Sequence, residues 1–168
     1  MSFSMYQASV PVFTRSLKML SNLLTKAEAH AKANGLKPED LVEARLAPDM
    51  YHLTRQIQAA ADAAKFGAAR PAGVTPPSHP DTETSFADLQ ARITSVLEFI
   101  NGIGEAAFAG SETRDVALKT GSGELKFNGQ DYLLSFALPN FFFHAVTAYD
   151  ILRHKGLPLV KRDYLNIG

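Results

Sequence analysis

Two sets of polar side chains recur at helical spacing and are of the types that bind metal ions or small ligands. Asn140, His144 and Thr147 are separated by four and three residues in the segment LPNFFFHAVTAYDILRHKG. At about 100° per residue they share a helical stripe with apolar residues such as Leu133 and Ile151. We therefore expect all three to point into the interior of a helical bundle, where a buried amide or imidazole requires hydrogen-bond partners.

The second polar set lies upstream and could supply these partners. Asp49, His52 and Gln56 recur at spacings of three and four beside an apolar helical stripe. Asp49 and Gln56 are expected at the edge of the inward face, and His52 further round, on the flank. If the two helices are neighbours, this set would face Asn140 and His144 across the core. Two histidines, a carboxylate and an amide would then lie together.

The elements that must position these residues are four segments with helical periodicity. The first has Pro11 in its opening turn and stops at Gly35, and the second begins near Pro48 and runs out near ARPAG. The third opens at Ser85 with a capping-box pattern, and the fourth runs from about NGQD to Gly156. Pro139 lies inside the fourth segment and should bend it.

Between the third and fourth segments the apolar period changes from helical to alternating. VALKTGSGELKF alternates on both sides of TGSG, which is typical of a short β-hairpin. The economical fold is all-α, a four-helix bundle with this hairpin between helices three and four. We expect a single domain over residues 1–168, since a chain of 168 residues can build one core.

Composition restricts the partners and the location. Seventeen basic residues balance seventeen acidic ones without a basic run, which disfavours nucleic acid and anionic membranes. The most apolar stretch, residues 133–152, contains too many polar groups for a membrane span and is expected to be a buried helix. The start MSFSMYQASVPVF has no secretory pattern, so we expect a cytoplasmic protein.

The fourth segment also carries apolar residues on its outward side. Phe142, Val146 and Tyr149 are expected to form a contact surface there. We favour a homodimer interface at this surface, and the alternative is that the hairpin or the C-terminal tail covers it.

Three stretches resemble a known family. ASVPVFTRSLKML, LAPDMYHLTRQI and GQDYLLSFALPNFFFHAVTAYDILRHKGLPLVKRDYL are similar to an uncharacterised domain family within the DinB/YfiT-like superfamily. The resemblance spans nearly the whole chain and implies a DinB-like four-helix bundle, often homodimeric. It also implies a divalent metal such as zinc or nickel, which relatives bind through one histidine of the second helix and an H-x3-H pair of the fourth. Some of those relatives are thiol-dependent transferases or isomerases of small molecules.

Carried over to this sequence, the H-x3-H pair falls on Asn140 and His144, and the second-helix ligand falls near His52. Asn140 departs from the pattern, because an amide oxygen is a poor substitute for imidazole as a ligand of zinc or nickel. His52, His144 and Asn140, with Asp49, would form at most a degenerate metal site.

Two functional hypotheses follow, and the sequence does not decide whether the protein is an enzyme. In the favoured one, the bundle is metal-free or binds metal weakly, and its polar layer fixes the packing or binds a small molecule, with Gln56 and Thr147 lining the pocket. In the alternative, the degenerate site holds a metal that activates water or a thiol in a small-molecule enzyme of the transferase or isomerase type.

Overall fold

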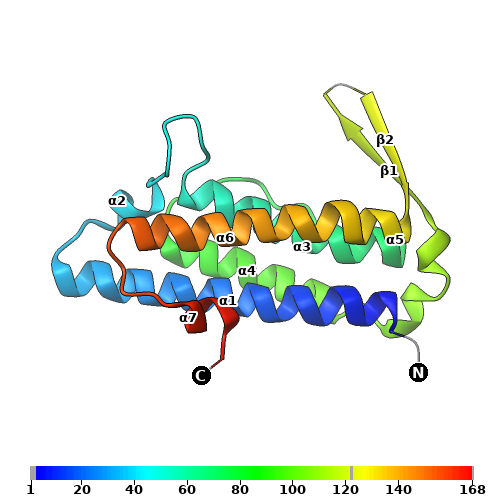
Figure 1. The fold of residues 1–168 in the computed structure, drawn as a ribbon, viewed down its shortest axis with the longest axis horizontal. Coiled ribbons are helices and arrows are strands. Elements are labelled where there is room, and N and C mark those ends of the chain that lie inside the picture. Colours follow the sequence, from blue (N-terminus) through cyan, green and yellow to red (C-terminus); the bar gives the residue numbers. More distant parts are fainter. Residues whose placement is uncertain (1–2, 122, 168) are drawn as a thin grey trace.

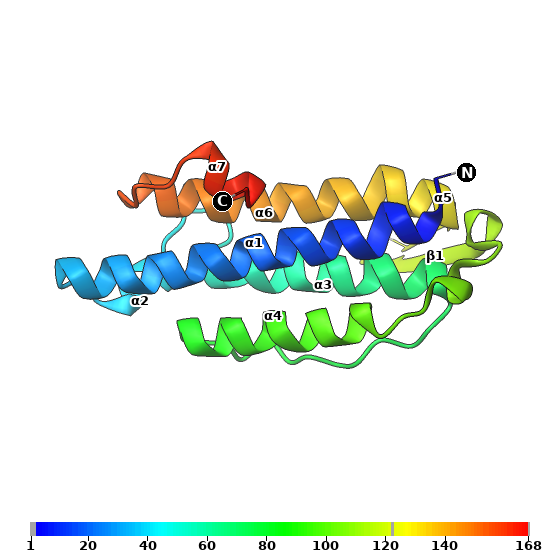
Figure 2. The same ribbon diagram turned by 90° about the horizontal axis from the view of Figure 1, so that it is seen from below.

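Four long helices form an elongated bundle in the part of the chain that the structure describes (Figure 1). The structure is a computed structural model, and it describes residues 3–121 and 123–167. The long helices are α1 (Met5–Asn34), α3 (Leu53–Ala72), α4 (Phe86–Asn101) and α6 (Leu138–His154). Helix α3 packs against α4 and α6, and α1 packs against the same two helices. Seen from below, α1 runs along the bundle between α6 and α4 (Figure 2).

Short elements connect the long helices. They are α2 (Pro38–Val42), η1 (Glu105–Phe108), η2 (Ser111–Thr113), β1 (Asp115–Thr120), β2 (Gly123–Asn128), α5 (Gly129–Asp131), the π-helical segment η3 (Tyr132–Ala137) and α7 (Lys161–Leu165). Strands β1 and β2 pair antiparallel from Asp115 opposite Asn128 to Thr120 opposite Gly123. Ser122, in the expected TGSG turn, lies outside the described residues. The expected all-α bundle with a hairpin before its last long helix is confirmed.

The core consists of the apolar stripes that the sequence periodicity indicates. Phe13, Leu53, Leu89 and Ile151, one from each long helix, are fully buried within one cluster of apolar side chains. None of the described helices is both long and apolar enough to cross a membrane. Because residues 1–2, 122 and 168 lie outside the described part, a single domain over residues 1–168 stays a prediction.

Two helix starts differ from the sequence expectation. Helix α1 begins at Met5, where Ser4 and Gln7 form a capping box, so Pro11 lies inside the helix. Helix α3 begins at Leu53, because the ring of His52 accepts the Arg55 amide N–H at 3.4 Å and so acts as the N-cap. Pro48 and Asp49 therefore lie in a loop. The third start is confirmed, since Ser85 and Asp88 form the expected capping box.

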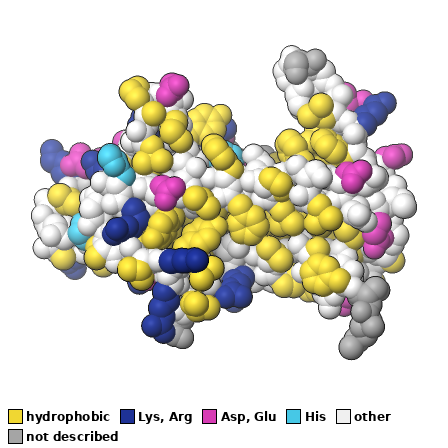
Figure 3. Space-filling model, in the orientation of Figure 1, with side chains coloured by type: hydrophobic (Ala, Val, Ile, Leu, Met, Phe, Trp, Pro, Cys, Tyr) yellow, Lys and Arg dark blue, Asp and Glu magenta, His cyan; other side chains and the backbone are white. Residues whose placement is uncertain are grey.

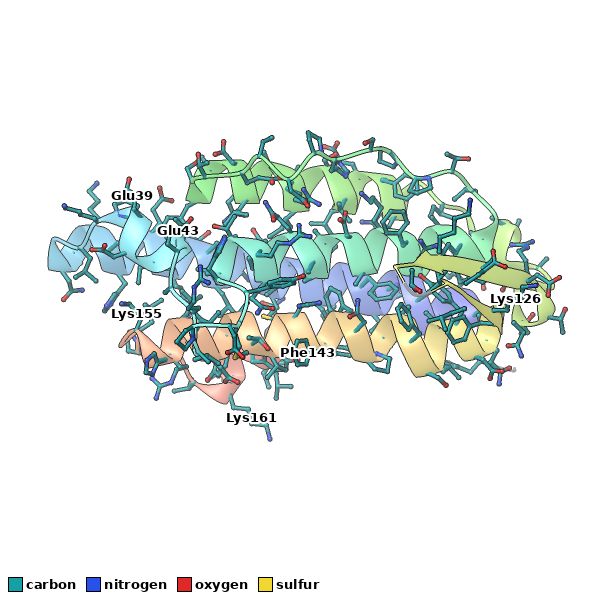
Figure 4. All side chains as sticks on the ribbon, turned by 90° about the horizontal axis from the view of Figure 1, so that it is seen from above. Glu39, Glu43, Lys126, Phe143, Lys155 and Lys161 are labelled. Atoms are coloured by element: carbon teal, nitrogen blue, oxygen red, sulfur yellow. The ribbon has the colours of Figure 1, made fainter. Side chains whose placement is uncertain are left out.

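Two projections stand on the same side of the bundle. The loop of residues 43–52 rises near one end and the β1–β2 hairpin rises near the other (Figure 1). Figure 4 shows this side from above, with Glu43 toward the loop end and Lys126 toward the hairpin end. The surface between them is formed by α3 and α6.

Candidate functional site

A pocket of about 270 Å³ lies along the contact between α3 and α6. Its walls carry small side chains from both helices, Ala59 and Ala63 from α3 and Ala137 from the end of η3. Alanines at these positions leave space that longer side chains would fill. We call it the α3–α6 pocket. Its other lining residues are Tyr51, Arg55, Asp62, Phe66, Arg70, Tyr132, Phe136, Asn140 and His144.

A buried amide fixes the imidazole at one end of the pocket. The His144 Nδ1 atom lies 2.8 Å from the Oε1 atom of Gln56, which is almost fully buried. The Gln56 amide nitrogen donates to the carbonyl oxygen of Tyr51 at 3.2 Å, which identifies Oε1 as the acceptor. His144 Nδ1 therefore carries the hydrogen, and Nε2 of the neutral ring has a free lone pair.

The surroundings of His144 favour this neutral form. Burial lowers the pKa of the imidazole, and the positive charge of Arg55 lowers it further. The ring stacks with Tyr51 at a centroid distance of 6.4 Å and an interplanar angle of 15°. The Arg55 guanidinium lies 5.4 Å from the centre of the same tyrosine ring. The site thus presents an uncharged hydrogen-bond acceptor near neutral pH.

An arginine occupies the opposite end of the pocket. The Arg70 guanidinium lies 4.4 Å from the ring centre of Phe66 and 5.5 Å from that of Tyr132. Arg70 Nη1 donates to the Tyr132 hydroxyl at 2.9 Å. Burial raises the pKa of Tyr132, so the hydroxyl keeps its proton. Among residues 3–121 and 123–167, no carboxylate forms an ion pair with Arg70.

The side chains of Asn140 and His144 lie at the rim of the bundle core, and the reason is local helix geometry. Segment η3 is π-helical and has more residues per turn than an α-helix. The inward positions after it are consequently shifted by about one residue. Phe141, Ala145 and Ala148 are fully buried, whereas Asn140 and His144 are half-buried beside α3.

The expectation that Asn140, His144 and Thr147 all point into the core therefore needs correction. Asn140 and His144 line the α3–α6 pocket instead. Thr147 is buried, but its hydroxyl donates to the Phe143 carbonyl oxygen of its own helix at 2.7 Å, and it does not line the pocket. Gln56 and Thr147 were the two residues expected to line a ligand pocket. Gln56 affects the pocket indirectly, by its hydrogen bond to His144, whereas Thr147 has no contact with the pocket.

The proposed metal ligands are not brought together. His52 caps α3, its Nε2 atom lies 3.9 Å from a carboxylate oxygen of Glu43, and it does not line the pocket. Asp49 is exposed in the loop before α3. Within the described part of the chain, no three His, Cys, Asp or Glu side chains are grouped as a metal site. The pocket offers one imidazole, the Asn140 amide and the Asp62 carboxylate, which is already paired with Lys65 and Arg92. Two arginines lie beside them, so this donor set does not fit a divalent cation.

Sequence reasoning missed the arginine end of the pocket. Arg70 falls in the last turn of α3, where a basic residue is common for electrostatic reasons alone. No sequence spacing could indicate that Arg70 and Tyr132 interact, because 62 residues separate them. Only the packing of η3 against α3 brings them together.

Apolar side chains on the outward side of α6 are partly covered. The Tyr149 ring packs edge-on against Tyr164 of α7 at 5.8 Å, and Phe142 is half-buried. Val146 and Phe143 remain exposed, at 39% and 59%. Figure 3 shows apolar side chains gathered on this face of the molecule. The tail therefore covers part of the proposed dimer surface, and dimerisation stays a prediction.

The chain folds as a four-helix bundle, and its similarity to solved structures identifies the bundle as DinB-like. The chain superimposes on the crystal structure of a DinB family member protein from Shewanella denitrificans with a TM-score of 0.90 and 41% sequence identity, covering 95% of this chain and 90% of that chain. The chain belongs to the family described as "Domain of unknown function (DUF1993)", which it matches over residues 5–165. A comparison with curated proteins found no match. The family resemblance seen in the sequence is thereby confirmed.

The lowered pKa of His144 leads to an expected pH dependence of stability. In the unfolded chain the imidazole binds a proton near its ordinary pKa, whereas the folded protein resists protonation. Acidification from about pH 7.5 to about pH 5 should therefore reduce the free energy of unfolding. His144→Phe should reduce this loss, as measured by urea unfolding across that range.

The comparison with His144→Phe isolates one group among several. The pKa of His79 is also lowered, by burial and by Lys65, so some pH dependence should persist in the variant. The Glu83 and Asp163 carboxyls, whose pKa values are lowered, lose their contribution only below about pH 4.5. Identical pH profiles for both proteins would show that His144 titrates normally in the folded state.

Proposed function

We propose that the protein binds a small organic molecule in the α3–α6 pocket. The observation that carries the proposal is the pairing of two separately anchored polar ends, His144 on Gln56 and Arg70 on Tyr132, along one alanine-lined hollow. Alanine and phenylalanine side chains line the pocket together with these polar groups, and apolar surface combined with a few fixed polar groups is typical of small-molecule sites. A volume of about 270 Å³ restricts the ligand to a small one.

The polar groups of the pocket have unused hydrogen-bonding capacity. Asn140 lies between the two ends, and none of the described residues bonds to its side-chain amide. His144 Nε2 and the Tyr132 hydroxyl proton are likewise available. A polar group used only to fix packing normally has its partners within the protein. This free capacity favours ligand binding over a purely structural role.

The proposed binding requires no metal ion, and a reaction catalysed on the bound molecule is the second candidate function. His144 lines the pocket with Nδ1 bonded to Gln56, so its unprotonated Nε2 atom can accept a proton from a ligand, which is the role of a general base. The metal-dependent transferase or isomerase alternative is not supported by the donor set around His144. Elemental analysis of untagged protein after dialysis against zinc or nickel tests this; stoichiometric metal lost in His144→Ala would restore the alternative.

The test of binding uses a variant that fills the pocket. A fragment library is screened by ligand-detected NMR against the wild type and Ala59→Leu, since Ala59 lines the pocket and is half-exposed. Ala87→Leu, the same change at an exposed position of α4, serves as the matched control. We expect fragments that bind the wild type and Ala87→Leu but not Ala59→Leu. Equal binding to all three proteins, or none to any, would contradict the proposal.

A homodimer and a cytoplasmic location remain predictions that accompany this proposal. The exposed Val146 and Phe143 side chains support the former, and light scattering of the wild type and Val146→Glu tests it.

A further inference from the structure

We infer that the ligand of the α3–α6 pocket is a small aromatic carboxylate that carries a hydroxyl group at the end remote from its carboxylate. This inference rests on the proposed function and specifies the ligand class. It follows from three features of the pocket, namely an arginine without an acidic partner, an imidazole that can only accept a hydrogen bond, and an apolar stretch between them.

The arginine end fits a carboxylate. Arg70 is held in place by the rings of Phe66 and Tyr132 and donates to the Tyr132 hydroxyl. Since that hydroxyl oxygen accepts from Arg70, its own hydrogen is free to donate to a ligand. The remaining Arg70 N–H groups and this hydroxyl together offer donors for the two oxygens of one carboxylate.

The other charges in the pocket are already neutralised. Asp62 forms ion pairs with Lys65 at 2.7 Å and Arg92 at 3.0 Å, so it opposes an anion only weakly. Arg55 is paired with Asp81. Arg70 is therefore the cation that a ligand has to balance, and a single negative charge at that end is the complement.

The imidazole end fits a hydroxyl. Because Gln56 fixes the hydrogen on His144 Nδ1, the free Nε2 atom accepts a hydrogen bond and cannot donate one. A second carboxylate there would place lone pairs against a lone pair. A hydroxyl supplies the proton that Nε2 requires, and the stacked Tyr51 and His144 rings suit a flat neighbour.

The distance between the ends sets the length of the ligand. Gln56 contacts His144 and Arg70 contacts Tyr132, and the α3 positions 56 and 70 are about 21 Å apart along the helix at 1.5 Å per residue. The Arg70 guanidinium lies over Phe66, four residues nearer the N-terminus of α3, which leaves roughly 15 Å along the helix for the ligand and its hydrogen bonds at both ends. Phe66, Phe136 and the alanines line this interval, which suits an aromatic ring.

The test uses three probes of nearly equal shape. They are 3-(4-hydroxyphenyl)propionate, its amide 3-(4-hydroxyphenyl)propionamide, which lacks the charge, and 3-(4-methoxyphenyl)propionate, which lacks the hydroxyl proton. We expect the wild type to bind the first probe about 10- to 100-fold more tightly than the amide and about tenfold more tightly than the methyl ether in calorimetric titration.

Three variants assign these differences in affinity to their residues. Arg70→Met should abolish the preference for carboxylate over amide while keeping the preference for hydroxyl over ether. Tyr132→Phe, which removes one hydroxyl and keeps the ring, should reduce the carboxylate preference in part. His144→Phe should remove the hydroxyl preference alone. The midpoint of urea unfolding is measured for each variant, and Tyr132→Phe keeps the test decisive if Arg70→Met does not fold.

The outcomes separate this inference from the proposed function. If library fragments bind the pocket but the carboxylate probe binds the wild type no more tightly than the amide, or neither probe binds, the inferred ligand class is wrong. In both cases small-molecule binding in the pocket stands. If no fragment and no probe binds, both are wrong. Carboxylate preference that survives in Arg70→Met would overturn the assignment of the anion to that arginine.

Discussion

Replacement of Arg92 by methionine should lower the free energy of unfolding by about 3 kcal/mol, because the largely buried Glu83 loses its cation and Asp62 and Asp81 each lose one of two. The Arg92 side chain, only 1% exposed, lies 3.0 Å from Asp62, 3.1 Å from Asp81 and 2.9 Å from Glu83. These ion pairs attach the loop that follows α3 to both α3 and α4. Removing one partner of a buried ion pair costs about 3–5 kcal/mol, and partial hydration of the exposed Asp81 places this case at the lower end. Urea unfolding measures the difference.

Two controls separate charge from packing in this experiment. Arg45→Met makes the same change at an exposed arginine whose contact is the Pro48 carbonyl oxygen at 3.4 Å, and it should alter stability by less than about 0.5 kcal/mol. Adding Glu83→Gln to Arg92→Met should restore part of the loss, since Glu83 is the most buried of the three carboxylates. A loss below about 1 kcal/mol in Arg92→Met would mean that the carboxylates hydrate freely.

Gly129→Ala is the second change with a large expected effect. A Cβ atom at Gly129 would lie 1.9 Å from the backbone carbonyl oxygen of Ser111, far inside van der Waals contact. Segment η2 and the start of α5 would have to separate, because a backbone atom cannot rotate away as a side chain can. We expect a loss of about 3 kcal/mol or more, at the upper end of overpacking effects, measured by urea unfolding.

Gly121→Ala provides the matched control for Gly129→Ala. A Cβ atom at Gly121, in the hairpin turn, would meet no heavy atom within 4 Å. The two variants make the same chemical change, so their difference reports the close approach at Gly129. Equal stabilities would show that η2 and α5 can move apart at little cost.

Local patterns predicted most of the fold. The third helix starts at Ser85 because its capping box with Asp88 is a local interaction, readable from the spacing of two residues. The hairpin between residues 115 and 128 followed from alternation around a glycine-containing turn. The helix starts at Met5 and Leu53 were predicted wrongly, because proline is common in the first turn of a helix and the prolines at positions 11 and 48 were assigned to that turn.

The candidate site could be predicted only in part. The sequence predicted that His144 contacts Asp49, His52 or Gln56 of the second helix. In the structure its hydrogen-bond partner among these is Gln56. His52 and Asp49 were wrongly placed on that helix, because an N-cap formed by a histidine ring has no clear sequence signature. The Arg70–Tyr132 end and the Arg92 ion pairs join residues distant in the chain, so neither spacing nor composition could indicate them.

The π-helical segment Tyr132–Ala137 has a consequence for how this protein and shorter relatives would differ. It accommodates one residue more than an α-helix of the same height and ends at Ala137, two residues before Pro139. Because the π-helical turn absorbs this extra residue, a relative one residue shorter with ordinary α-helix here would keep its downstream side chains on the same faces. The same number of residues wound as uninterrupted α-helix would instead rotate everything downstream by about 100°, turning Asn140 and His144 into the core and Phe141 out of it. Residue count and helix type in this one turn thus decide together whether the two polar side chains of α6 border α3.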